Sequence, residues 1–146
     1  MSNVLFITTD QQHYLAMGYR NPELRTPNLD RLVSEGTTFH RAYTVNPTCT
    51  PTRASWLTGT YPSQHGAYSL GTKLMEDQRT VADCFHDSGF ATALVGKAHF
   101  QPLLSTGDYS SLESYPTLHD LAFWREFHGP YYGFERVELA RNHTDE

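Results

Sequence analysis

Cys49-Thr50-Pro51-Thr52-Arg53 is the segment of this sequence that holds the most reactive chemistry in the fewest residues. It contains a thiol, which can act as a nucleophile, and, four positions later, a guanidinium whose charge is permanent. Pro51 fixes the backbone dihedral between them. Cys49 is one of only two cysteines in 146 residues, and it stands in a polar stretch rather than on an apolar face. This context favours a chemical role for Cys49 over a packing role.

Other interpretations of Cys49 differ in how well they fit the spacing. A small buried thiol is a common structural role for cysteine, and it stays open. A phosphatase loop of the Cys-x5-Arg type fails, because Arg53 comes two positions too early and position 55 is serine. A zinc site fails as well, because Cys84 is 35 positions away and no paired histidine spacing accompanies the two cysteines.

The composition indicates one ordinary globular domain and argues against two classes of partner. Hydrophobic residues make up 38% of the 146 residues and aromatic residues 13%, which suits a chain with a core. A formal net charge of −5 leaves no broad cationic face for nucleic acid. No apolar run approaches the roughly 20 residues of a membrane span. Without a secretory signal or a disulfide framework, we expect a cytoplasmic location.

Hydrophobic periodicity and turn residues predict strands that alternate with helices. The expected strands are residues 4–8, 37–44, 90–95 and 132–139. The expected helices are residues 27–35, 53–57, 81–88 and 118–125. Thr80 with Asp83 resembles a capping pair, and Cys84 is expected on the inner face of the helix that follows. The alternation predicts an α/β protein with a mainly parallel sheet flanked by helices.

In parallel sheets, ligands bind beyond the carboxyl ends of the strands. Asp10 follows the first expected strand, the Cys49 loop follows the second, and Lys97 and His99 follow the third. We therefore expect these polar groups at one edge of the sheet. Lys97 and His99 would alternate along an extended chain, so both can face one site only where the backbone turns.

The Cys49–Gly59 stretch resembles the signature of the type I sulfatases, which is Cys-x-Pro-x-Arg with a downstream Thr-Gly. Further matches in the same order are Asn3–Gln12, Thr26–Asp30, Gly59–Pro62 with His65-Gly66, and Gly96–His99. The resemblance implies the three-layer α/β/α fold of the alkaline-phosphatase-like superfamily, incomplete in this chain. Residues 1–146 would be the N-terminal part of a catalytic domain, with no internal boundary.

The resemblance also implies a modified nucleophile. In that family the cysteine is converted to formylglycine, so Cys49 would be the modified residue. One hydroxyl of the aldehyde hydrate attacks the sulfate ester, and loss of the proton from the other ejects sulfate and restores the aldehyde. A thiolate, by contrast, would leave a stable thiosulfate ester. Arg53 would hold a hydroxyl of the hydrate and offset negative charge.

The remaining site residues are assigned by the same resemblance. Lys97 and His99 would contact the sulfate and the formylglycine, and His65 would either line the pocket or serve a turn. Asp10 would bind a divalent metal together with the modified Cys49, and Ca²⁺ fits best, with Mg²⁺ or Mn²⁺ as alternatives. Many sulfatases have two successive aspartates here, whereas this chain has Asp10-Gln11, so Gln11 is a doubtful ligand.

Three functions follow, with different partners. The first is hydrolysis of a small-molecule sulfate ester, in which a later segment of the enzyme would supply the missing ligands. The second is a phosphonate or phosphate ester hydrolase of the same superfamily, a branch that the Asp10-Gln11 form also resembles. The third is a non-catalytic α/β fragment that forms a homo-oligomer through an exposed sheet edge. Plain structural roles remain as alternatives: an Asx turn for Asp10, and exposed or loop positions for Arg53, Lys97 and His99.

Overall fold

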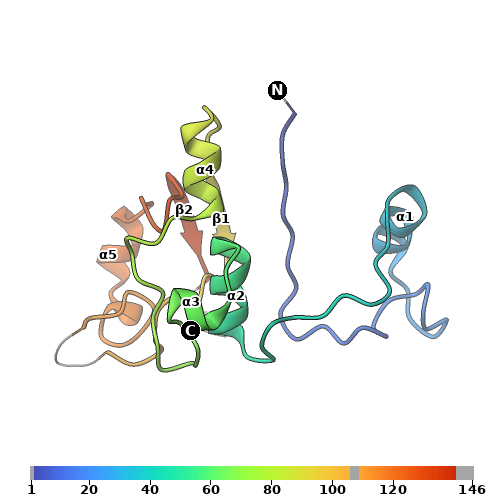
Figure 1. Cartoon of the computed structure of the whole chain (residues 1–146), viewed down its shortest axis with the longest axis horizontal. Helices are drawn as coiled ribbons and strands as arrows, with labels where there is room; N and C mark the ends of the chain where they lie inside the picture. Colours follow the sequence, from blue (N-terminus) through green and yellow to red (C-terminus); the bar gives the residue numbers. More distant parts are fainter. Residues whose placement is uncertain (1, 106–108, 141–146) are drawn as a thin grey trace. The chain divides into compact units, whose positions relative to one another are not determined.

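The computed structural model describes residues 2–105 and 109–140. The chain forms two compact units, Met1–Ala42 and Tyr43–Glu146. Helix α1 (Pro27–Glu35) belongs to the first unit, and the other helices and both strands belong to the second (Figure 1). The expectation of a single catalytic domain over residues 1–146 stays a prediction.

Helix α1 forms where the sequence predicts it. Pro27 occupies the first turn, where its missing N–H is no loss, and the N–H of Gly36 donates to the Leu32 carbonyl at the other end. Asp30 accepts hydrogen bonds from the Thr26 hydroxyl at 2.9 Å and from the backbone N–H of Tyr19 at 3.1 Å. None of the described residues of this unit is buried, so local contacts of this kind hold the helix in place.

The strands expected over residues 4–8 and 37–44 are wrong. The structure assigns no strand to either stretch, and Val4, Leu5, Phe6 and Ile7 are 65–83% exposed. β-branched and aromatic residues suit a pleated, half-buried surface, but a strand exists only where a neighbouring strand completes its hydrogen bonds. Within the described part of the first unit, no such neighbour is present.

The second unit contains a parallel pair of strands, β1 (Ala93–Gly96) and β2 (Arg136–Leu139), which pair in the register Ala93↔Arg136 to Gly96↔Leu139. The helices of this unit lie around this pair (Figure 1). Parallel strands need a long crossover, and the chain between them includes the 3-10 helix η1 (Thr117–His119) and α5 (Leu121–Glu126). The predicted α/β class with a parallel sheet is therefore confirmed.

Three further helices precede the strands: α2 (Cys49–Thr58), α3 (Pro62–His65) and α4 (Val81–Asp87). Helix α2 begins four residues before the expected start and ends at Gly59, whose φ of 69° is in the left-handed region that glycine tolerates. Helix α4 begins at the predicted capping pair, since the Thr80 hydroxyl accepts from the Asp83 N–H and the Asp83 carboxylate accepts from the Thr80 N–H. Within the described ranges, no helix has the length and apolarity needed to cross a bilayer.

The inner face of α4 differs from the expectation. Cys84 was expected in the core, but it is exposed, and Val81 is 44% exposed. Ala82 is the buried residue of this helix. Periodicity places Cys84 on an apolar face of the helix, but the residue that is buried depends on what packs against α4.

The core of the second unit joins α2, the strands and the segments that follow them. Its buried members are Ala54, Leu57, Ala67, Leu74, Ala98, Phe100, Tyr131, Tyr132 and Val137. The ring of Phe100 packs edge-on against that of Tyr132, with centroids 5.2 Å apart. The Tyr132 hydroxyl donates to the Leu74 carbonyl at 2.6 Å, so this buried polar group is satisfied.

Replacing Thr80 by alanine should lower the free energy of unfolding by about 1–2 kcal/mol. The change removes the acceptor for the Asp83 N–H and the donor to the Tyr132 carbonyl, which is 3.0 Å away. Urea unfolding monitored by circular dichroism measures the effect. Thr80→Ser is the matched control, because it keeps the hydroxyl and loses only a methyl group. Equal losses in the two variants would contradict a capping role for the hydroxyl.

Candidate active site

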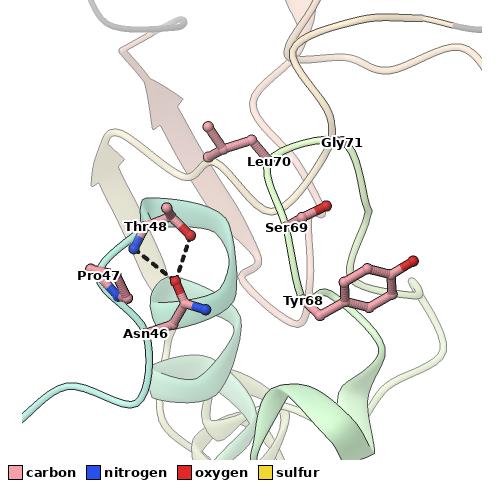
Figure 2. Close-up of a pocket in the computed structure, with 7 residues that line it drawn as sticks. All are labelled: Asn46, Pro47, Thr48, Tyr68, Ser69, Leu70 and Gly71. Carbon is pink, nitrogen blue, oxygen red and sulfur yellow. Dashed lines mark hydrogen bonds between the residues drawn. The ribbon is translucent and has the colours of Figure 1, made fainter.

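Cys49 is the first residue of α2, and its side chain is half-buried. The chain enters the helix through a short polar turn. Asn46 Oδ1 accepts from the backbone N–H of Thr48 at 2.8 Å and from the Thr48 hydroxyl at 2.6 Å (Figure 2). The turn fixes the direction of the backbone just before Cys49. The thiol thus lies at the positive end of a ten-residue helix, where first-turn N–H groups favour negative charge.

The residues after Cys49 are packed into the protein. Thr50, Pro51, Thr52 and Arg53 are all buried. The Thr52 hydroxyl donates to the Asn46 carbonyl, and it also bonds with the Thr44 hydroxyl at 2.8 Å. The first turn of α2 is therefore tied to the segment that leads into it, and the Cys49 backbone has a defined position.

Arg53 joins two segments that are far apart in the sequence. Its Nη1 donates to the backbone carbonyl of Lys97 at 2.7 Å, across 44 positions. The Arg53 guanidinium also lies 6.0 Å from the centroid of the Trp56 ring. The structure thus brings the Cys49–Arg53 segment next to the segment that carries Lys97 and His99.

The backbone turns where Lys97 and His99 require it. Gly96 has a φ of 103° and His99 a φ of 56°, both in the left-handed region. His99 is 1% exposed, whereas Lys97 is half-buried. A left-handed backbone is uncommon for a residue other than glycine, so surrounding contacts must stabilise it at His99.

Glu113 supplies those contacts, and the sequence analysis missed it. Its carboxylate accepts from three successive backbone N–H groups, those of His99, Phe100 and Gln101. Burial raises the pKa of this carboxyl group, and hydrogen bonds from the Tyr131 hydroxyl and these N–H groups oppose the rise. No motif or spacing marks Glu113 in the sequence, because its role depends on contacts made only in the folded chain.

His65 is buried against α2. Its Nε2 lies 2.9 Å from the Ser55 hydroxyl, and its Nδ1 accepts from the backbone N–H of Ala67 at 3.1 Å. Because Nδ1 accepts, Nε2 carries the proton of the neutral ring and donates to Ser55. The ring is 2% exposed, and burial lowers the pKa of His65. This geometry connects α3 to α2; a contact between His65 and a substrate stays a prediction.

A pocket opens beside the first turn of α2 (Figure 2). It has a volume of about 560 Å³. The residues that line it are Asn46, Pro47, Thr48, Tyr68, Ser69, Leu70 and Gly71. One wall is therefore the turn that precedes Cys49, and the other is the segment after α3. Thr48, the residue directly before Cys49, is part of this lining.

Asp10 and Gln11 lie in the first unit, where both are exposed and Gln11 has a φ of 54°. Cys49 lies in the second unit. Among the described side chains, no three from histidine, cysteine, aspartate and glutamate gather in a way that could hold a metal ion. The assignment of Asp10, Gln11 and Cys49 as metal ligands stays a prediction.

The fold and the Cys49–Arg53 segment agree with the comparison to known families. Residues 2–140 match the family model described as Sulfatase. The chain belongs to the sulfatase family, which confirms the resemblance found in its motifs.

Two curated sulfatases illustrate how much of such a protein this chain represents. It is 34% identical over 160 residues to the uncharacterized sulfatase YidJ of Escherichia coli, a match that covers 99% of this chain and 31% of that protein. It is 41% identical over 98 residues to an ulvan-active sulfatase of Formosa agariphila, which covers 66% of this chain and 19% of that protein. The chain therefore spans less than a third of the length of these relatives.

Solved structures support the same fold. A phosphonate monoester hydrolase from Silicibacter pomeroyi aligns with a TM-score of 0.71 and 29% identity, over 97% of this chain and 26% of that one. The protein BT4656, in complex with its substrate D-glucosamine-2-N,6-O-disulfate, aligns with a TM-score of 0.56 and 33% identity. That match covers 60% of this chain and 18% of the other.

Lowering the pH should destabilise the protein through His65. Burial lowers the pKa of His65 in the folded state, so the unfolded chain takes up a proton more readily. The free energy of unfolding should therefore fall as the pH drops through about 6.5, the ordinary histidine value. His65→Gln should lower stability at neutral pH and remove this part of the pH dependence.

Urea unfolding at a series of pH values measures both effects. His119→Gln, which changes an exposed histidine, is the control for the loss of any imidazole. An unchanged pH profile in the His65 variant would contradict this interpretation of the buried ring.

Proposed function

We propose that this chain contributes the nucleophile and part of the anion-binding site of a sulfuric ester hydrolase. The observation that carries the proposal is the hydrogen bond from Arg53 to the Lys97 carbonyl. It holds the Cys-Thr-Pro-Thr-Arg segment, at the start of α2, against the Gly-Lys-Ala-His segment after β1. Membership of the sulfatase family supports the same reaction.

In this proposal, a separate maturation enzyme converts Cys49 to formylglycine with an external two-electron oxidant: the Cβ–S bond breaks, the sulfur leaves as H₂S, and Cβ gains a doubly bonded oxygen. Its hydrate supplies a nucleophilic hydroxyl and, through its second hydroxyl, a route for releasing sulfate. The position suits such a group, because Cys49 is half-buried at the helix terminus and is not a member of the hydrophobic core. The first-turn amides of α2 favour the negative charge of the sulfate ester.

Arg53, Lys97 and His99 bind and orient the sulfate in this proposal. The hydrogen bond from Arg53 to the Lys97 carbonyl keeps the two segments together. The positive charges of Arg53 and Lys97 can then bind the anion and offset the charge that develops as the ester breaks. His99 is buried, so its backbone direction decides where its ring can donate a hydrogen bond. His65 acts as a positioning residue, because its bond to Ser55 steadies α2 near its middle.

The pocket beside the turn that precedes Cys49 supports a class of substrate. Its volume of about 560 Å³ and its Tyr68 and Leu70 side chains suit the alcohol part of a small sulfate ester. BT4656 was solved with a sulfated glucosamine, which supports a sulfated sugar as one such ester. We propose Asp10 as a ligand of a divalent cation, with Ca²⁺ first, to be completed by residues outside those described.

A phosphonate monoester hydrolase is the second candidate. The alignment with the Silicibacter pomeroyi enzyme, at a TM-score of 0.71 over 97% of this chain, favours it specifically. Sulfate and phosphonate monoesters are both tetrahedral anions, so the same guanidinium and helix terminus can bind either of them.

Mass spectrometry of the protein from its native host tests the nucleophile. The tryptic peptide that contains Cys49 should be lighter than the unmodified peptide by the difference between H₂S lost and one oxygen atom gained. The peptide that contains Cys84, which is exposed and outside the motif, is the internal control and should keep its thiol. Recovery of unmodified Cys49 alone would contradict the formylglycine proposal.

Kinetics of the full-length protein on aryl sulfate and aryl phosphonate monoesters decide between the two hydrolases. We expect a higher kcat/KM on the sulfate. Arg53→Lys should lower that value by roughly 10²–10³, because lysine keeps the charge but cannot both donate to the Lys97 carbonyl and bind the anion with a planar fork.

Arg79→Lys is the matched control, since Arg79 is an exposed arginine that pairs with Asp87 on α4. It should retain the activity of the unchanged protein. A higher kcat/KM on the phosphonate would favour the second candidate. Equal kcat/KM values in the Arg53→Lys and Arg79→Lys variants would contradict a role for Arg53 in binding the anion.

A further inference from the structure

A single buried carboxylate organises the segment after β1. Glu113 is 5% exposed. Its Oε2 accepts from the His99 N–H at 2.5 Å, and its Oε1 accepts from the N–H groups of Phe100 at 2.9 Å and Gln101 at 3.2 Å. Oε1 also accepts from the Tyr131 hydroxyl at 2.8 Å. Both carboxylate oxygens are thus satisfied by donors on neighbouring segments.

The side chain of Gln101 also bonds to the segment that contains Glu113. Its Oε1 accepts from the backbone N–H of Leu112 at 2.7 Å, and Gln101 is 2% exposed. A side chain from each of the two segments therefore binds the backbone of the other. We call residues 99–101 and 111–113, with these reciprocal bonds, the cross-brace. It replaces the regular strand pairing that these irregular segments lack.

We propose that Glu113 is a positioning residue that sets the orientation of the His99 side chain in the hydrolytic site. The inference rests on the proposed function, because it assumes that His99 faces the ester. Glu113 does not touch the reacting atoms. It binds the N–H of the residue whose ring acts, and of the next two residues.

The geometry explains how the effect would reach the ring. His99 has a φ of 56°, a conformation that a residue with a Cβ rarely adopts. In that conformation the Cα–Cβ bond of His99 points differently from its direction on an ordinary extended chain. Two charge-assisted acceptors on three adjacent N–H groups stabilise this turn. Without them, we expect the backbone to relax and the imidazole to lose its direction.

Glu113→Gln tests the proposal with little change in shape. The amide has one oxygen, whereas Glu113 uses one oxygen for His99 and the other for three further donors. The amide oxygen of the variant should keep the position that serves three donors. Its NH₂ group should then face the His99 N–H, which loses its acceptor. Hydrogen exchange by NMR should be at least about ten-fold faster at the His99 amide.

The Val137 amide is the internal reference, because Val137 is buried on β2 and its N–H donates to the His128 carbonyl at 2.8 Å. Its exchange should stay unchanged. Equal acceleration at Val137 and His99 would mean a general loss of stability and would overturn the positioning role. Unchanged exchange at His99 would overturn it as well.

Glu76→Gln is the matched control variant. Glu76 accepts from the Gln101 side chain and from the Tyr109 hydroxyl, so the control makes the same chemical change close to the cross-brace without touching the backbone of residues 99–101. Its His99 amide should exchange as in the unchanged protein. Tyr131→Phe is a second variant that keeps the carboxylate and removes one donor, and it should accelerate exchange at His99 by a smaller factor.

Kinetics on an aryl sulfate provide the functional readout in the full-length protein. Glu113→Gln should lower kcat roughly 10- to 100-fold and leave KM nearly unchanged, since the substrate still meets Arg53 and Lys97. A rise in KM at constant kcat would overturn the proposal. A protein with no sulfatase activity would refute the proposed function, and the exchange measurement would still decide whether Glu113 holds His99.

Discussion

A guanidinium cannot be buried without hydrogen-bond acceptors, and Arg53 is 8% exposed. It meets this requirement in part with the carbonyl of Lys97, which belongs to the segment after β1. The position of α2 and the position of that segment are therefore linked by a charge-assisted bond. Any displacement of one segment would cost the bond or carry the other segment with it. The relation between Cys49 and Lys97 depends on this constraint.

Other buried side chains around the site also bond to groups on other segments. The Thr52 hydroxyl binds the Asn46 carbonyl, His65 binds Ser55, and Glu113 binds three N–H groups. In each case a buried side chain bonds to a group from another segment, and several of these groups belong to the backbone. The strand pair itself is only four residues long on each side. Side chains, more than the sheet, fix the geometry of the irregular segments that carry the candidate site.

Local signals in the sequence predicted the parts of the fold that local forces determine. The Thr80 cap and the glycine stop at Gly59 depend on neighbours within a few positions. The strands near residues 93 and 136 were also predicted from local composition, although their pairing joins residues 43 positions apart. Lys97 and His99 could face one site only where the backbone turns, and the positive φ of His99 shows a turn at that residue. Membership of the family followed from ordered motifs, because several short matches in sequence order are far more specific than one.

Long-range contacts decided what the sequence could not predict. Val4 to Ile7 has the composition of a buried strand, but composition does not supply a partner strand. Cys84 fits an apolar face by periodicity, but the packing of α4 turns Ala82 inward instead. Glu113 gave no signal at all, because its four donors come from residues 12 to 18 positions away. Contacts of this kind appear only when the chain has folded.

The cross-brace has a consequence for how this part of the protein can vary. The bonds of the Gln101 and Glu113 side chains join the two segments directly. The position of His99 therefore does not depend on the number of residues between these segments. Lengthening a closed loop costs little, about 0.6 kcal/mol for each doubling. An insertion between Gln101 and Ser105 would therefore leave the reciprocal bonds of the cross-brace in place. The cross-brace thus makes the position of His99 independent of the length of the chain that joins its two sides.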